Sequence, residues 1–302
     1  MFRAILFDLS GVLYLGDRAI EGAVEAIARV QNSALQPRFV TNTSRLTRQD
    51  LLKRLQGLGF AIDAEQLFTA TTAAHDWVSQ YGKRPFCLVH ENIRSEFADL
   101  DQSDPNAVII GDAADGFNYA NLNRAFQLCQ QGAPLIGIGR NRYFRLGDEL
   151  LLDAGPFINA IEYAASCEAI IMGKPSAAFL QQVLATIECD TDQVLMIGDD
   201  VHGDVEGALD KGLQACLVQT GKYQAGDEKR IDGEFLIYPS VVEIVDQLYL
   251  RHLVGAYAGT GSRPYHPAML VALLLYGYAT GVFSSRRRSS VCDTAGIVKH
   301  SS

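Results

Sequence analysis

The stretch AILFDLSGVLYLG, residues 4–16, decides the fold of this chain. Its first half is a short apolar run that predicts a buried strand, and the strand ends in a carboxylate, Asp8. Apolar residues at helical spacing follow over 21–31, then a second strand over 38–41 and a second helix over 47–57. This order predicts an α/β protein whose core is a Rossmann-like parallel sheet with helices on both faces.

The same alternation continues along most of the chain. The further predicted strands are 86–90, 107–111, 134–138, 169–172, 194–198 and 214–219, and the further predicted helices are 119–131, 156–165, 177–187, 205–211 and 241–250. No linker rich in Pro, Gly or Ser precedes residue 254, so a second domain would have to be inserted within the pattern. We therefore expect a discontinuous core over 1–72 and 166–253, a smaller inserted α/β domain over 73–165, and a tail over 254–302.

Length and composition narrow the class of protein. With 302 residues, 48% of them hydrophobic, the chain can bury roughly three quarters of its unfolded surface. Its net charge of -9 makes the body of the chain poorly suited to non-specific nucleic-acid binding. The six cysteines form no C-x-x-C pair, which indicates reduced thiols, and the N-terminus lacks the pattern of a signal peptide. We therefore expect a cytoplasmic protein.

Polar side chains follow four of the apolar runs. In the segments FDLS, VTNTS, MGKPS and MIGDDVHGD they are Asp8, Thr41, Asn42, Lys174, Asp199, Asp200 and Asp204. Because the carboxyl ends of parallel strands gather at one edge of a sheet, where such folds bind ligands, we expect these side chains to lie close together. Each alone could be a helix cap, a turn or a solvated loop residue. Together they indicate a site.

The residue types suit the transfer of a phosphoryl group. A carboxylate such as Asp8 can attack phosphorus, and Lys174 can offset the repulsion between the two anions. Asp8 and Asp199 could hold Mg²⁺, a hard cation that binds one or two protein carboxylates together with phosphate and water. The Thr41 hydroxyl and the Asn42 amide can donate hydrogen bonds to phosphate oxygens.

The motifs FDLSGVLY, VTNTS, GKP and GDDVHGD resemble those of the haloacid dehalogenase superfamily of phosphatases. The segments VHENIRSEF, NYANLNRAF, LLLDAGPFINAIEYA and GDDVHGDVEGALDKGLQACLVQTGKY are similar to the phospholysine phosphohistidine inorganic pyrophosphate phosphatase subfamily. The resemblance covers about residues 1–250 and places the insert where type-two capped members carry their cap domain. It implies a small phosphorylated substrate or a phosphorylated side chain, and a homodimer formed through the cap.

The resemblance also implies roles for individual residues. Asp8 would be the nucleophile, and Asp8, the backbone carbonyl of Ser10 and Asp199 would bind Mg²⁺. Asp204 would steady the metal without being one of its direct ligands. The phosphate would be held by Thr41, Asn42 and Lys174.

Ser10 departs from the superfamily pattern, in which most members carry Asp two residues after the nucleophile. That Asp protonates the leaving group and then activates water, whereas a hydroxyl is both a weak acid and a weak base. Such proton transfer contributes about 10²- to 10⁴-fold in rate. We therefore expect substrates whose leaving groups need little help, namely phosphoramidates and pyrophosphate, rather than alkyl phosphate esters.

Further polar residues carry weaker signals. His202 lies between the acids of GDDVHGD, and we interpret it as a loop residue rather than a ligand. In the insert, His90 and Arg94 could contact substrate, although ordinary surface roles fit them better. The segment 139–149, GRNRYFRLGDE, carries three arginines and could face an anionic substrate, but it reads more readily as a solvated hairpin.

The tail has a different character. Its segment SRPYHPAMLVALLLYGYATGVFSSRRR resembles the N-terminal region of insertion-sequence transposases. A membrane anchor over 268–285 is the alternative, since that stretch carries no charge and is followed by three arginines. Interior Gly, Thr and Tyr residues make it only moderately apolar, so we expect no membrane association.

Three other functions stay open at this point. The scaffold could serve a phosphomonoesterase of nucleotides or sugar phosphates, and only a substrate panel separates these. Loss of turnover could have left a binding module, with Ser10 as its sign, although the intact Asp8, Lys174 and Asp199 argue against this. A DNA-binding transposase fragment would need the tail to act alone, and no nucleic-acid role is expected for the acidic core.

Overall fold

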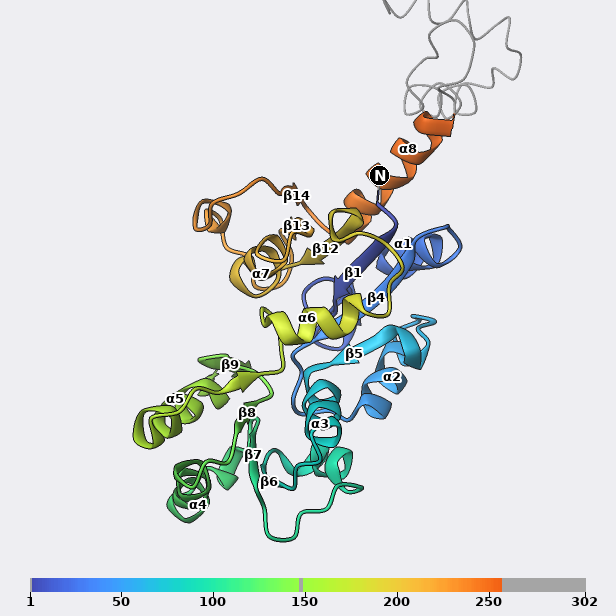
Figure 1. Cartoon of the computed structure of the whole chain (residues 1–302). Helices are drawn as coiled ribbons and strands as arrows, with labels where there is room; N and C mark the ends of the chain where they lie inside the picture. The colour runs from blue at the N-terminus through green and yellow to red at the C-terminus, as the bar shows by residue number, and fades with distance from the viewer. Residues whose placement is uncertain (1, 147–148, 257–302) are drawn as a thin grey trace, which may run out of the picture. The chain divides into compact units, whose positions relative to one another are not determined.

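The structure of the chain, a computed structural model, describes residues 2–146 and 149–256 (Figure 1). A six-stranded parallel sheet forms its core. Across the sheet the strands are β14 (Leu236–Tyr238), β13 (Gln214–Val218), β12 (Val194–Gly198), β1 (Ala4–Asp8), β4 (Gln36–Thr41) and β5 (Leu67–Thr69). The expected parallel α/β core is therefore confirmed.

Strand β1 lies inside the sheet because its sequence is apolar on both faces. All five of its residues are buried, and Leu6 pairs in register with Met196 of β12 and Arg38 of β4. A strand that is covered on both faces has no solvated side, which is why its residues read as a continuous apolar run rather than an alternating one. Asp8 is the position at which this run meets the edge of the sheet.

Helices lie between the strands along the chain. They are α1 (Ala23–Gln31), α2 (Arg48–Gly57), α3 (Ala70–Gln80), α6 (Ala177–Leu184) and α7 (Gly207–Leu209). A last helix, α8 (Val241–Ala256), follows β14. The buried residues of α1, among them Ala23, Ile27 and Val30, recur at helical spacing, as the sequence predicts. Thr47 caps α2 by accepting a hydrogen bond from the backbone N–H of Asp50 at 3.0 Å.

A second parallel sheet is inserted between β5 and β12. Its strands, in spatial order, are β11 (Ile170–Ile171), β8 (Leu135–Gly137), β7 (Ala107–Ile110) and β6 (Pro85–Leu88). Val108 and Ile110 pack in one apolar cluster with residues of α4 (Tyr119–Gln130) and α5 (Ala154–Ala165), whereas the intervening Ile109 belongs to another cluster. This alternation shows that both faces of the second sheet are covered.

Two hairpins complete the described structure. The first joins β2 (Tyr14–Leu15) and β3 (Arg18–Ala19), a few residues after the end of β1. The second joins β9 (Tyr143–Leu146) and β10 (Glu149–Leu152) in antiparallel register. A hairpin is therefore present, over 143–152 rather than the predicted 139–149.

Some elements differ from the sequence prediction. Strand β5, helix α3 and strand β14 were not predicted, and the helix expected over 205–211 is a π-helical turn (Val201–Glu206) followed by one turn of α-helix. Strand β11 lies beyond residue 165 yet pairs with β8 in the second sheet. We therefore propose that the inserted domain extends at least to Ile171.

The C-terminal part of the chain is described only to Ala256, within a second compact unit that begins at Glu243. The expectations for the tail, both the transposase-like segment and the alternative anchor over 268–285, fall outside the described residues. Within the described ranges, no helix is long and apolar enough to cross a membrane. The five cysteines that the structure describes are free thiols, as predicted.

Candidate active site

The strand ends bring three of the predicted residues together. Asp8 ends β1, Thr41 ends β4, and Asp199 follows β12. Because β1 is paired with both of the other strands, the three residues lie at the same edge of the main sheet. Lys174 reaches this edge from the loop between β11 and α6.

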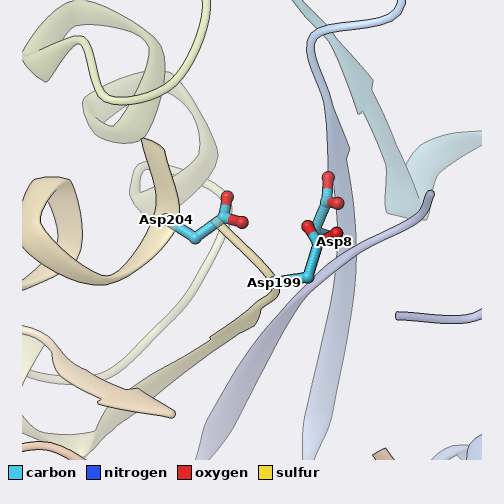
Figure 2. Close-up of side chains that lie close together, drawn as sticks. All are labelled: Asp8, Asp199 and Asp204. Carbon is cyan, nitrogen blue, oxygen red and sulfur yellow. The ribbon is translucent and has the colours of Figure 1, made fainter. Parts of the chain in front are cut away.

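Three buried carboxylates surround the end of β1 (Figure 2). One oxygen from each of Asp8, Asp199 and Asp204 lies within 4.8 Å of the others. The first two come from strand ends, whereas Asp204 comes from the π-helical turn. The structure therefore brings together three of the acids that the sequence analysis singled out.

Lys174 supplies positive charge beside the cluster. Its Nζ contacts the Oδ1 of Asp8 and lies 2.7 Å from the Oδ1 of Asp204. Burial alone would lower the pKa of Lys174, but Asp204 and Asp8 together raise it, so the side chain is held in its charged form.

The remaining charge is unbalanced. Burial, together with the carboxylates of Asp8 and Asp204, raises the pKa of Asp199 to about 7. Burial likewise raises the pKa of Asp204 to about 6, although Lys174 acts in the opposite direction. One lysine is therefore too little positive charge for three acids, and a further cation would stabilise their ionised forms.

The cluster fits a hard divalent cation. Oδ1 of Asp199 is buried, and no hydrogen-bond partner for it occurs among the residues that the structure describes. Its other oxygen, Oδ2, accepts a hydrogen bond from the backbone N–H of Lys222 at 2.7 Å, which fixes the orientation of the carboxylate. Mg²⁺ prefers oxygen ligands, and the Oδ1 of Asp199 is a buried oxygen that is left available for such an ion.

The residues predicted to hold phosphate lie at the same edge of the sheet, but their side chains already form contacts within the protein. The side-chain amide of Asn42 donates to the backbone carbonyl of Lys174 at 2.8 Å, and its oxygen accepts from the Lys174 N–H at 2.7 Å. The Thr41 hydroxyl donates to the hydroxyl of Thr43 at 3.0 Å. Asn42 therefore positions Lys174.

Two glycines allow the chain to pass closely around Asp199. Gly11 and Gly221 both have positive φ, of +92° and +64°. A Cβ atom on either one would lie 2.0 Å from the Oδ2 of Asp199. Only a residue without a side chain permits this approach.

Gly221→Ala is expected to destabilise the fold more than Gly16→Ala, which is a matched control. Gly16 has a similar φ of +55°, but nothing lies within 4 Å of its Cβ position. The control therefore carries only the cost of the left-handed conformation, about 1–2 kcal/mol, whereas overpacking adds about 1–3 kcal/mol at Gly221. Urea unfolding of both variants measures the difference, and equal losses would contradict the packing around Asp199.

Lys222 is a site residue that the sequence reasoning missed. Besides its backbone bond to Asp199, its Nζ lies 3.2 Å from the Oδ2 of Asp200. Lys222 belongs to the segment TGK, which contains polar residues and comes shortly after the buried strand β13. The rule that found Asp8 and Asp199 would therefore have found Lys222 as well.

A cavity of about 480 Å³ opens over these residues. Ser10, Thr41 and His202 line it from the core. The second domain contributes further side chains, and the sequence analysis considered only those within 139–149 as facing a substrate. The lining side chains of the second domain are Asp112, Arg140, Asn141, Arg142, Phe144 and Asp153. Part of the segment 139–149 therefore faces the cavity, whereas the sequence analysis favoured a solvated hairpin there.

Two further candidates are placed by the structure. His90 and Arg94 line a separate cavity of about 320 Å³ and are absent from the lining of the first one. His202 does line the first cavity, and its Nδ1 lies 2.7 Å from Glu206.

Arg45, another residue that the sequence did not indicate, joins the two domains beside the cavity. Its Nε donates to the buried carboxylate of Asp112, and its guanidinium lies 4.3 Å from the centre of the Phe144 ring. Asn92 donates to its backbone carbonyl at 3.3 Å. These contacts give the cavity a wall that comes from both domains.

Comparison with protein families gives three matches. The model for haloacid dehalogenase-like hydrolases matches residues 5–103, and a second hydrolase model, HAD-hydrolase-like, matches 171–244. A transposase domain model matches 228–294, most of which lies outside the described residues. The resemblances stated for the body and for the tail of the chain are thus confirmed.

Individual proteins give the same result. Haloacid dehalogenase-like hydrolase domain-containing protein 2 of Bos taurus is 43% identical over 83% of this chain and 97% of its own length. The phospholysine phosphohistidine inorganic pyrophosphate phosphatase of Rattus norvegicus is 43% identical over 83% of this chain and 95% of its own. A solved structure of a hypothetical protein from Pyrococcus horikoshii is 27% identical, with a TM-score of 0.75 over 82% of this chain and 100% of that one.

Proposed function

Because the chain belongs to the haloacid dehalogenase-like hydrolase family, we propose that it is a magnesium-dependent phosphatase in which Asp8 is the nucleophile. The observation that carries this proposal is the contact between Asp8 and Lys174 at the edge of a cavity lined by acids. A carboxylate that is held beside a buried cation can approach an anionic phosphoryl group.

The proposed reaction has two steps. One oxygen of Asp8 attacks phosphorus, the bond from phosphorus to the leaving group breaks, and water then hydrolyses the aspartyl-phosphate to restore the carboxylate. Lys174 holds positive charge at this point throughout, and Asn42 keeps its backbone in place. Thr41 and the neighbouring loop line the space for the phosphate oxygens.

Asp8, Asp199 and the backbone carbonyl of Ser10 would hold Mg²⁺, with Asp204 close by. When bound, the ion neutralises charge on the phosphoryl oxygens. Asp204 is also paired with Lys174, so it links the positively charged side chain of Lys174 to the acid cluster.

The substrate is proposed to be a phosphoramidate, inorganic pyrophosphate, or both. Two observations support this: Ser10 lines the cavity at the position of the missing acid, and a 43% identical relative is named for phospholysine, phosphohistidine and inorganic pyrophosphate. A weak P–N bond, or a phosphate leaving group, needs less protonation than an alkoxide does. Turnover of a sugar phosphate faster than of imidodiphosphate would contradict this choice.

Ser10→Asp is expected to raise kcat for simple phosphate esters by about tenfold or more, because general acid–base help of this kind contributes roughly 10²- to 10⁴-fold. Ser10→Asn is the matched control, since asparagine has the shape of aspartate but no carboxyl group that could take up or release a proton. Steady-state assays with a sugar phosphate measure both variants. If the two variants behave alike, another group performs the proton transfer.

The second domain is proposed to act as a cap, comprising the inserted segment predicted over 73–165 and extended to Ile171. Its contribution to the cavity wall supports a role in selecting substrate and excluding water. A cytoplasmic location and a homodimer formed through the cap are further proposals. Size-exclusion chromatography with light scattering tests the homodimer.

The function is tested by phosphate release from a panel of phosphoramidates, pyrophosphate and phosphate esters. We expect release that is lost on chelation of divalent cations and restored by Mg²⁺. Full activity of the chelated protein would contradict the metal site, and absence of release from every member of the panel would contradict the phosphatase assignment.

A further inference from the structure

The charged groups that line the cavity can be sorted by their partners. Arg45 is paired with Asp112, Arg140 with Glu162, and Lys222 with Asp200. Lys174 lies between Asp8 and Asp204. These four cations are therefore neutralised by side chains of the chain itself.

Arg142 differs from them. It lines the same cavity, and among the described residues no salt bridge or side-chain hydrogen bond of its guanidinium is found. It is exposed to solvent, and it also lines a neighbouring cavity of about 370 Å³. An arginine in this situation can bind an incoming anion without first losing an internal ion pair.

The backbone of Arg142 is held firmly in place. Its carbonyl accepts a hydrogen bond from the N–H of Asp153 at 3.3 Å, and the carbonyl of Asn141 accepts one from Gly155 at 2.9 Å. A Cβ at Gly155 would lie 2.5 Å from the oxygen of Asn141, so the helix start and the hairpin are in close contact there. The origin of the arginine side chain is thus fixed relative to α5.

In the proposed function, the transferred phosphoryl group lies against Asp8 and Lys174. Arg142 belongs to the inserted domain, not to the core that holds these two residues. Arg142 and the pair of Asp8 and Lys174 thus line one cavity from different parts of the chain.

We infer that Arg142 binds a second anionic group on the leaving half of the substrate, so that the preferred substrates are diphosphate-type compounds. This inference rests on the proposed function and selects among its substrates. With pyrophosphate, Asp8 bonds to one phosphorus, the bridging P–O bond breaks, and the departing phosphate keeps the bridging oxygen and both bonding electrons. Arg142 contacts this departing phosphate, and water then releases the second one from Asp8.

The test compares kcat/KM for pyrophosphate with kcat/KM for p-nitrophenyl phosphate, whose leaving half has no second phosphate, using the full chain. Arg142→Leu is expected to lower the pyrophosphate-to-ester ratio by about 10- to 100-fold, mainly through KM, as loss of a charge-assisted hydrogen bond would. Arg142→Lys should recover part of the ratio. A ratio within about twofold of wild type in Arg142→Leu would overturn the inference.

Arg84→Leu is the matched control, because Arg84 lies in the same inserted domain, is paired with Asp104 at 3.1 Å, and does not line the cavity. Its ratio should equal that of wild type, and a shift as large as that of Arg142→Leu would also overturn the inference. Calorimetric binding of methylene diphosphonate separates the two proposals. If the wild type hydrolyses neither substrate, the proposed function fails, while a 10-fold weaker binding to Arg142→Leu would still support the anion site and unchanged binding would refute it.

Discussion

Asp8→Asn is expected to lower kcat for phosphate release by about 10³-fold or more, since loss of a nucleophile removes the covalent route altogether. The amide keeps the shape of the carboxylate but is a far weaker nucleophile. It also removes one negative charge from the three-acid cluster, so the fold should survive. Any remaining release therefore reports a route that bypasses residue 8.

Asp17→Asn is a suitable control for this variant. Asp17 lies in the β2–β3 turn, where its side chain is 97% exposed and paired with Arg54. Removing an exposed charge of this kind changes little. Release from Asp8→Asn within tenfold of wild type, or an equal loss in Asp17→Asn, would contradict the assignment of the nucleophile.

Lys174→Met is expected to destabilise the protein by about 3–5 kcal/mol, because removing one partner of a buried ion pair leaves the other charges uncompensated. Lys174 is 7% exposed, and both of its partners, Asp8 and Asp204, are buried acids. Phosphate release should fall as well, since the remaining acids would then repel an anionic substrate.

Denaturant unfolding with and without Mg²⁺ measures this effect. Lys53→Met is the control, because the side chain of Lys53 is 64% exposed and its ion pair with Asp50 spans 3.7 Å. If the cluster binds a cation, added Mg²⁺ should recover part of the lost stability of Lys174→Met. Equal stability of the two variants would contradict the electrostatic description of the cluster.

The sheet was predictable wherever burial on both faces makes a strand read as an apolar run. Strand β12 has the predicted bounds of 194–198, and β1 ends at Asp8, as predicted. Strand β5 has only three residues, too few to show a period, and α3 has a small-residue sequence, ATTAAHDWVSQ, in which alanines and threonines form much of the buried face. Neither gives a strong local signal.

The acid cluster was predictable because Asp8 ends one strand, Asp199 directly follows the neighbouring strand, and Asp204 lies in the turn after it, so topology brings them together. The contacts between distant segments were not. Asn42 and Lys174 are 132 residues apart. Nothing in either motif indicates that the side-chain amide of Asn42 holds the backbone of Lys174. Arg45 and Asp112 likewise meet only because the chain returns across the cavity.

The transposase-like end of the chain raises a separate point. The matched transposase domain begins at 228, within the part that also matches the hydrolase models, and continues beyond the described residues. The residues of the acid cluster all lie before 228. The site therefore lies within the hydrolase-like part of the chain.

The most direct test of that account is to trap the phosphorylated enzyme. Protein that is quenched during turnover of pyrophosphate is reduced with borohydride, which converts an aspartyl-phosphate into homoserine, and is then mapped by peptide mass spectrometry. We predict homoserine at position 8 in the wild type and none in the Asp8→Asn variant. Reduction at a different aspartate, with residue 8 unchanged, would contradict the claim that Asp8 bonds to phosphorus.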